Sequence, residues 1–200
     1  MSAATSPGAP APLVAVTMIR EHLRDLPRWL LPEGFCLRAF RTGDRRTWMD
    51  LQRRSEPNIT ITDRHFDHDL GTNLPAMTRR CLFLVSPDGE DIGTITAWYL
   101  RSFHGQRWGR IHWVAIVPEC RGRGLAKGMM TAAMNRLREL GHRRAMLVTH
   151  TVRTVAIRTY LNFGFIPDLS LPGAIEAWQS VRRELAHPAL DPLPEVAKPN

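Results

Sequence analysis

The sequence predicts an α/β fold, in which helices cover the faces of one mixed β-sheet. Two observations lead to this class: the chain contains a β-hairpin, and a strand–helix–strand–helix–strand series follows it. The 200 residues amount to 22.7 kDa, which is enough for one domain that buries its own core and too little for two large domains.

The composition separates a folded body from two tails. Residues 1–12 are rich in Ala, Pro, Ser and Gly, and residues 187–200 hold four prolines. Neither stretch buries enough apolar surface to offset the entropy lost on ordering. We therefore expect a disordered tail at 1–12, one folded domain at 13–186 and a Pro-rich tail at 187–200.

The spacing of apolar residues predicts the elements of the first half in order. Residues 18–31 have helical spacing and stop at a proline, so we expect an N-terminal helix there. Residues 35–41 alternate as a strand does, and Asp44 then opens a helix. Residues 81–85 and 92–100 flank an Asp-Gly step, which is a strong signal for a hairpin turn.

The second half continues with a strand at 110–117, which ends at a proline, and a helix at 125–140 with an apolar stripe, which a glycine closes. The remaining expected elements are a strand at 145–149, a helix at 155–161, a short strand at 164–166 and a helix at 174–185. The cluster at 65–69, His-Phe-Asp-His-Asp, is expected to be a solvated helix or loop rather than a metal site.

Charge, cysteine spacing and the lengths of the apolar runs limit the classes of protein to which the chain can belong. The formal charge of +8 comes almost wholly from arginine, and it predicts attraction to anionic ligands or to nucleic acid. Cys36, Cys81 and Cys120 lack paired spacing, so we expect ordinary thiols and no metal. No apolar run approaches the length of a membrane span, and no convincing secretory signal precedes residue 16, so we expect a cytoplasmic protein with no membrane partner.

The most informative stretch is 117–127, Val-Pro-Glu-Cys-Arg-Gly-Arg-Gly-Leu-Ala-Lys, a glycine-rich turn between a strand and a helix. Such a turn binds anions, because its glycines let the backbone approach a phosphate and the helix N-terminus adds partial positive charge. A P-loop would need a glycine directly before Lys127, where Ala126 stands, and a Rossmann fingerprint would need a third glycine at 127.

Arg121, Gly124 and Ala126 fill the pattern Arg-x-x-Gly-x-Ala, and Ala-Ile-x-x-Tyr-x-x-x-Gly-Phe follows at 156–165. With these two motifs in this strand order, the chain resembles the GCN5-related N-acetyltransferase (GNAT) superfamily. The resemblance implies a central mixed sheet with splayed strands, acetyl-CoA as co-substrate, and a small-molecule or peptide amine as acceptor. A homodimer is compatible with it, and nucleic acid is not expected as a partner.

The resemblance also implies roles for individual residues. It places the backbone of Val114 and Ile116 on the pantetheine arm and Tyr160 as the acid that protonates the leaving thiolate. It assigns the pyrophosphate to the amides of a run of seven residues: Arg121, Gly122, Arg123, Gly124, Leu125, Ala126 and Lys127. The strand at 110–117 is expected to carry a bulge.

The base is less clearly indicated. Histone-acetyltransferase-like members have a Glu where this chain has Arg110, and a guanidinium does not accept a proton at neutral pH. Arylalkylamine N-acetyltransferases carry a His that matches His112, which is our candidate base. Strand parity predicts Arg110 and His112 on one face and Trp113 on the other. Arg153 stands where members commonly have a pantetheine-binding Asn.

Two other functions remain open at this point. A non-catalytic acyl-CoA-binding or regulatory module would keep the turn at 121–127 and lack a usable base, which Arg110 favours. A nucleic-acid-associated protein would explain the arginine excess, although the arginines are dispersed and no recognition motif of an established nucleic-acid fold is present.

Overall fold

Seven β-strands form one sheet in the computed structural model, which describes residues 13–56 and 59–195. The strands are β1 (Ala15–Arg20), β2 (Cys36–Ala39), β3 (Cys81–Val85), β4 (Asp91–Phe103), β5 (Gln106–Ile116), β6 (Ala145–His150) and β7 (Ile166–Pro167). Their order across the sheet is β2-β3-β4-β5-β6-β1-β7, and only the β5–β6 pair is parallel. The predicted mixed sheet is confirmed. The expected N-terminal tail lies outside the described residues.

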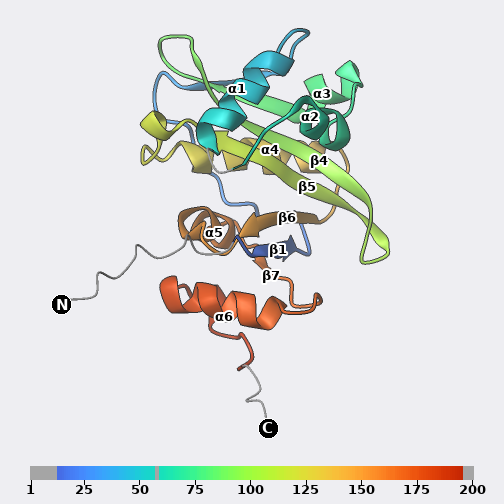
Figure 1. The fold of residues 1–200 in the computed structure, drawn as a ribbon, viewed down its shortest axis with the longest axis vertical. Helices are drawn as coiled ribbons and strands as arrows, with labels where there is room; N and C mark the ends of the chain where they lie inside the picture. The colour runs from blue at the N-terminus through green and yellow to red at the C-terminus, as the bar shows by residue number, and fades with distance from the viewer. Residues whose placement is uncertain (1–12, 57–58, 196–200) are drawn as a thin grey trace, which may run out of the picture.

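Helices cover both faces of this sheet (Figure 1). They are α1 (Arg45–Ser55), α2 (Asp63–Asp69), α3 (Leu74–Arg80), α4 (Leu125–Glu139), α5 (Thr154–Asn162) and α6 (Ala174–Glu184). Helices α1 and α2 lie on one face of β4 and β5, and α4 lies on the other. Among the helices that the structure describes, none is both long and apolar enough to span a bilayer.

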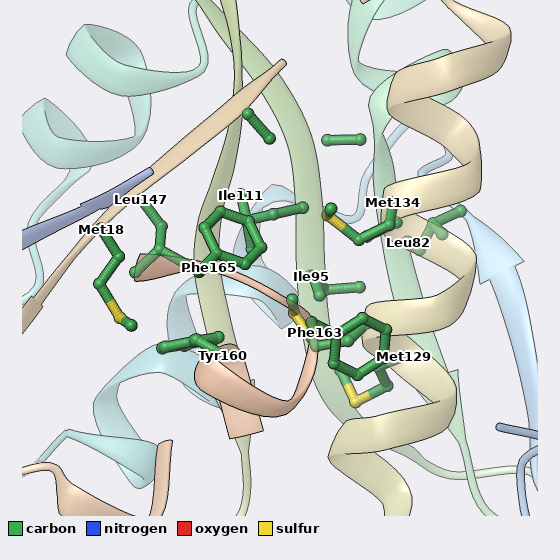
Figure 2. Close-up of a cluster of buried hydrophobic side chains, with 14 of the residues drawn as sticks. Met18, Leu82, Ile95, Ile111, Met129, Met134, Leu147, Tyr160, Phe163 and Phe165 are labelled. Atoms are coloured by element: carbon green, nitrogen blue, oxygen red, sulfur yellow. The ribbon is translucent and has the colours of Figure 1, made fainter. Parts of the chain in front are cut away.

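The core lies mainly between α4 and the central strands. Figure 2 shows Ile95 of β4 and Ile111 of β5 near Met129 and Met134 of α4, and all four side chains are buried. The same cluster continues to Tyr160 and to the aromatic rings that follow α5. The apolar stripe predicted for the helix at 125–140 is therefore the face that α4 buries.

Strands β5 and β6 part shortly after they meet. Their parallel pairing covers only Gly109↔Ala145 and Arg110↔Met146. Beyond it, β5 carries a bulge, because Thr96 pairs with His112 and Thr94 with Ala115, which leaves two residues of β5 opposite one of β4. The first of these two, Trp113, has φ +49°, a backbone angle that is rare for a bulky side chain. The predicted splay and bulge are both confirmed.

The predicted helix at 18–31 is wrong. Its first residues belong to β1, which pairs along its whole length with β6 and also with β7. Leu30, which contributed to the helical spacing, is 78% exposed. Pro27 lacks the N–H that a helix interior uses, whereas β6 offers a strand partner to every residue of β1, and β7 pairs with Met18 and Ile19. Long-range pairing therefore outweighs a local pattern that resembles a helix.

Smaller differences concern the ends of elements. β5 begins at Gln106, four residues before the predicted strand, because β4 and β5 form a hairpin longer than the apolar pattern indicates. β7 begins at Ile166 rather than at 164, since Gly164 has φ +73°. The cluster at 65–69 lies in α2, a solvent-facing helix as expected, although Asp69 is half-buried.

The predicted C-terminal tail is packed in its first part. Residues 188–190 form a 3-10 turn, and Leu190 and Leu193 belong to the buried core. The prolines of this stretch do not prevent packing, because a fixed φ lowers the entropy that is lost on ordering. The folded body therefore extends beyond residue 186, and residues 196–200 lie outside the described part.

We expect Leu190→Ala to lower the free energy of unfolding by about 2–4 kcal/mol, because it removes a fully buried side chain. Urea denaturation followed by circular dichroism measures this change. The matched control is Leu171→Ala, since Leu171 is 54% exposed and its truncation is expected to cost less than about 0.5 kcal/mol. Equal stability of the two variants would show that residues 187–195 do not pack in solution.

Candidate active site

A cleft of about 630 Å³ lies between the end of β5, the glycine-rich turn and α5. It is lined by all the residues predicted to bind the cofactor and by the predicted acid: Val114, Ile116, Arg121, Gly122, Arg123, Gly124, Leu125, Ala126, Lys127 and Tyr160. The candidate base His112 is not among its lining residues. The structure therefore brings together every predicted site residue except one.

The turn presents a row of backbone donors to this cleft. Gly122 and Gly124 have φ angles of +76° and +77°, and a Cβ on either would point into open space. The amides of Arg121 and Lys127 donate to carbonyls within the turn, at 3.2 Å each. In the described structure no backbone carbonyl pairs with the amides of residues 122–126, which lead into the N-terminus of α4. Five backbone amides of the turn, and not the predicted seven, are therefore free to donate to a ligand. Five such amides fit a pyrophosphate.

The cationic side chains of the turn are held by the surrounding protein. Arg121 donates from Nη2 to the carbonyl oxygen of Ser55 (2.7 Å) and from Nε to that of Ile116 (3.0 Å), so it links the turn to α1 and β5. The guanidinium of Arg123 lies 5.0 Å from the centre of the Phe35 ring, and Lys127 Nζ lies 5.6 Å from that of Trp29. The side chain of Arg121 therefore fixes the position of the turn relative to α1 and β5.

The β6-facing edge of β5 is available for a ligand. Pairing with β6 stops at Arg110, so residues 111–116 have no strand partner on that side within the described chain. An extended ligand can bind such an edge through backbone hydrogen bonds, as an added strand does. Val114 and Ile116 lie on this stretch and line the cleft, so the edge fits the pantetheine arm.

Tyr160 reaches the cleft from α5. Its side chain is largely buried, and Figure 2 shows it in the core beside Met18 and Leu147. Burial raises the pKa of Tyr160 to about 12, an effect that the nearby Arg153 opposes and Glu56 reinforces. The hydroxyl therefore keeps its proton throughout the neutral range and is able to donate it.

An ion pair joins two walls of the cleft. Arg153, at the N-terminus of α5, donates from Nη2 to Glu56 Oε2 at 2.8 Å, and both residues line the cleft. Glu56 directly follows α1 and is 97 residues away in sequence. No sequence signal predicts it as a cleft residue. The residue in place of the expected Asn is thus neutralised by a carboxylate of the same chain.

His112 lies on the face of β5 that α2 covers. Its Nε2 is 3.2 Å from Asp69 Oδ2, and its side chain is 13% exposed. Burial lowers the pKa of His112, its hydrogen bond to Asp69 raises it, and the charge of Arg110 lowers it further, with a net lowering. Arg110 shares this face, as predicted, because β5 pairs with β4 without a register shift between Arg110 and His112.

The prediction that Trp113 points away from His112 is wrong. Trp113 Nε1 donates to Asp69 Oδ2 at 2.9 Å, so both side chains reach one carboxylate oxygen. The bulge explains this, because an extra residue with positive φ breaks the two-residue alternation. The Trp113 carbonyl accepts from Thr94 Oγ1 (3.1 Å), which in turn accepts from the buried Gln52 Nε2 (2.7 Å). These bonds hold the bulge in place.

The stretch that contains Asp69 is expected from the sequence to be solvated, whereas the structure places Asp69 against β5. The available signal is the pattern of two histidines and two aspartates at 65–69, but nothing in the sequence indicates that α2 ends beside β5. In the described ranges, 13–56 and 59–195, no group of three or more His, Cys, Asp or Glu could hold a metal ion. The three cysteines are free thiols.

The sequence is similar to those of proteins that are named acetyltransferases. The chain is 28% identical over 145 residues to the protein named mycothiol acetyltransferase of Streptomyces griseus, a match that covers 70% of this chain and 46% of that protein. It is 29% identical over 159 residues to that of Thermobispora bispora, covering 74% and 52%. The chain thus spans about half the length of these curated relatives.

Solved structures share the fold. A GCN5-related N-acetyltransferase from Sphaerobacter thermophilus superposes with a TM-score of 0.60 at 23% identity, covering 78% of this chain and 50% of the other. A GNAT-family acetyltransferase from Colwellia psychrerythraea gives 0.59 at 11% identity, covering 78% and 53%. The model of the "Acetyltransferase (GNAT) family" matches residues 45–165, from the start of α1 to the end of the second motif. The chain therefore belongs to the acetyltransferase (GNAT) family.

Proposed function

We propose that the protein is an N-acetyltransferase that transfers the acetyl group of acetyl-CoA to a primary amine by direct attack of the amine. One observation carries the proposal: a single cleft combines five unpaired turn amides, the open edge of β5 and the protonated hydroxyl of Tyr160. These groups suit a ligand with a diphosphate, an extended amide-containing arm and a thiol leaving group.

Within this proposal the protein contributes binding and proton transfer. The amides of 122–126 and the N-terminus of α4 bind the pyrophosphate, and the β5 edge at Val114 and Ile116 aligns the arm. Acetyl-CoA supplies the thioester that makes the acetyl group reactive. Tyr160 gives its proton to the sulfur as the bond to the acetyl carbon breaks, and His112 removes a proton from the amine, directly or through a water.

The acceptor is proposed to be a small-molecule amine. Two sequence relatives are named mycothiol acetyltransferase, so the desacetyl form of mycothiol belongs in the test panel, together with amino acids, aminoglycosides and short peptides. A peptide amine remains the second class of acceptor. Loops vary among members of a fold and often carry its binding specificity. We therefore expect the segments on the α1–α2 side of β5 to determine which class of amine is acetylated.

Release of free CoA tests the proposal directly. The purified chain is mixed with acetyl-CoA and each acceptor, and the new thiol is measured with a colorimetric reagent. Acceptor-dependent thiol release supports the enzyme. Tight acetyl-CoA binding without release for any acceptor would instead support a non-catalytic acyl-CoA-binding module, the alternative that Arg110 favours because it stands where a carboxylate base is common.

If His112 is the base, His112→Gln should lower kcat/KM by about a hundredfold and remove its acidic limb. The wild-type limb is expected below pH 6.5, because the pKa of His112 is lowered, so protonation abolishes proton acceptance only in more acidic solution. The pH profile is measured with one acceptor for both proteins, so that the ionisation of the acceptor itself cancels. Binding of acetyl-CoA should be unchanged.

A structural role for His112 gives a different result. In that case the melting temperature of His112→Gln falls while the acidic limb persists, and the amine loses its proton to solvent. The two measurements on one variant therefore decide whether His112 belongs to the catalytic residues.

A further inference from the structure

Asp69 makes contacts that an ordinary surface carboxylate does not make. Its Oδ2 accepts hydrogen bonds from Trp113 Nε1 (2.9 Å) and lies 3.2 Å from His112 Nε2, while its Oδ1 lies 2.7 Å from His68 Nδ1. The side chain is 21% exposed. Asp69 is the last residue of α2, whereas His112 and Trp113 flank the start of the β5 bulge. One carboxylate thus joins the helix to the strand that borders the cleft.

The carboxylate is ionised at neutral pH. Burial favours the neutral acid, but the hydrogen bonds from His112, His68 and Trp113 outweigh it, and the pKa of Asp69 lies well below its usual range. An ionised carboxylate only accepts hydrogen bonds. The imidazole nitrogen that faces Asp69, which is Nε2, must therefore carry a hydrogen.

This contact determines the form of His112. Since burial and the charge of Arg110 keep the imidazole neutral at pH 7, it carries one hydrogen only. With that hydrogen on Nε2, the other nitrogen, Nδ1, has a free lone pair. Within the described residues, Nδ1 of His112 has no hydrogen-bond partner, which leaves this atom free to accept a proton. When it does so, the adjacent carboxylate stabilises the imidazolium that forms.

We propose that Asp69 is a positioning residue, which fixes His112 with Nε2 protonated and Nδ1 as the proton acceptor, and which offsets the positive charge that His112 gains. This inference rests on the proposed function. In the proton-transfer step, the N–H bond of the attacking amine breaks, a bond from the same hydrogen to Nδ1 forms, and the electron pair of the N–H bond stays on the amine nitrogen. Asp69 neither gains nor loses a proton.

The bulge is part of the same arrangement. Because Trp113 has positive φ, its indole turns to the side of His112, and its N–H orients the carboxylate oxygen that His112 uses. The Trp113 ring also packs edge-on against Trp48 of α1, with ring centres 5.1 Å apart. The bulge that opens the β5 edge thus also places the carboxylate for His112.

The proposal is tested by separating the charge of Asp69 from its hydrogen bonds. Asp69→Asn keeps an oxygen that accepts from both Trp113 and His112 and loses the charge, so the pKa of His112 should fall further. We expect kcat to drop about tenfold, the acidic limb to move to lower pH, and the melting temperature and acetyl-CoA affinity to stay close to those of the wild type. Asp69→Ala loses the oxygens too, and kcat should fall by about a hundredfold.

A second measurement is independent of turnover. In the ¹⁵N spectrum of the imidazole groups, wild-type His112 should show a protonated Nε2 and an unprotonated Nδ1, and Asp69→Ala should show a mixture of the two forms. The matched control is Asp67→Asn, two residues earlier on α2, whose carboxylate pairs with Arg45 instead. This control should leave both the spectrum and the pH profile unchanged.

Two results would overturn the proposal: a wild-type spectrum with the hydrogen on Nδ1, or an Asp69→Asn protein with the kcat and pH profile of the wild type. Failure of the proposed function looks different, because the wild type then releases no thiol with any acceptor. In that case Asp69 has no reaction to support, and the nitrogen spectrum still shows whether it fixes the form of His112.

Discussion

Gly124→Asp is expected to abolish acetyl-CoA binding. Gly124 has φ +77° at the N-cap of α4, and its missing side chain leaves open space beside the five free amides. A carboxylate placed there would lie close to the pyrophosphate, and like charges about 4 Å apart at a protein surface repel by about 4 kcal/mol. Affinity should therefore fall by roughly a thousandfold, which isothermal titration calorimetry detects as loss of binding.

The chain offers a control with the same backbone strain. Gly173 is the N-cap of α6 with φ +73°, a Cβ there also meets open space, and Gly173 is not among the residues that line the cleft. Gly173→Asp should lower the melting temperature about as much as Gly124→Asp and leave acetyl-CoA binding intact. Gly124→Ala adds the Cβ without the charge and should weaken binding much less. If a folded Gly124→Asp protein keeps the wild-type affinity for acetyl-CoA, the pyrophosphate does not bind at this turn.

The turn could be predicted from the sequence because its signals are local. A strand that ends at a proline, glycines at 122 and 124 and an apolar helical stripe each act over a few residues, and the structure keeps them in that order. The segment at 18–31 could not be predicted in the same way. Its first residues, 18–20, belong to β1, whose conformation depends on pairing with β6 more than 120 residues later in the sequence. No local pattern contains that information.

The same distinction applies to the site. The position of Tyr160 in the cleft follows from a motif within one helix, whereas Glu56 and Asp69 reach the site from helix ends that lie 97 and 43 residues from their partners. The face of Trp113 was predicted wrongly, because parity assumes an unbroken strand. The wrongly predicted segment also supports the site, since Trp29 packs against Lys127 of the turn. Contacts of this kind depend on how distant elements are arranged in the fold, so no local sequence pattern predicts them.

Tyr160→Phe is expected to lower kcat by about a hundredfold or more while leaving the dissociation constant of acetyl-CoA nearly unchanged. The substitution keeps the buried ring, which packs edge-on against Phe165 with ring centres 6.4 Å apart, and removes only the hydroxyl. Stability should therefore change little. Because burial raises the pKa of Tyr160 to about 12, this group stays almost fully protonated at pH 10. The wild-type kcat should accordingly show no loss from Tyr160 near pH 10, where an ordinary tyrosine ionises.

The other tyrosine provides the control. Tyr99 lies on β4 with its ring 4.7 Å from the guanidinium of Arg80, outside the cleft, so Tyr99→Phe should keep wild-type kcat. Single-turnover kinetics must first establish that chemistry limits the rate, since slow product release would hide the loss. If Tyr160→Phe then keeps full kcat, the thiolate takes its proton from solvent. If both kcat and acetyl-CoA affinity fall together, the hydroxyl binds the thioester arm instead of donating a proton, because a group that acts only on the departing sulfur contributes nothing to the bound ground state.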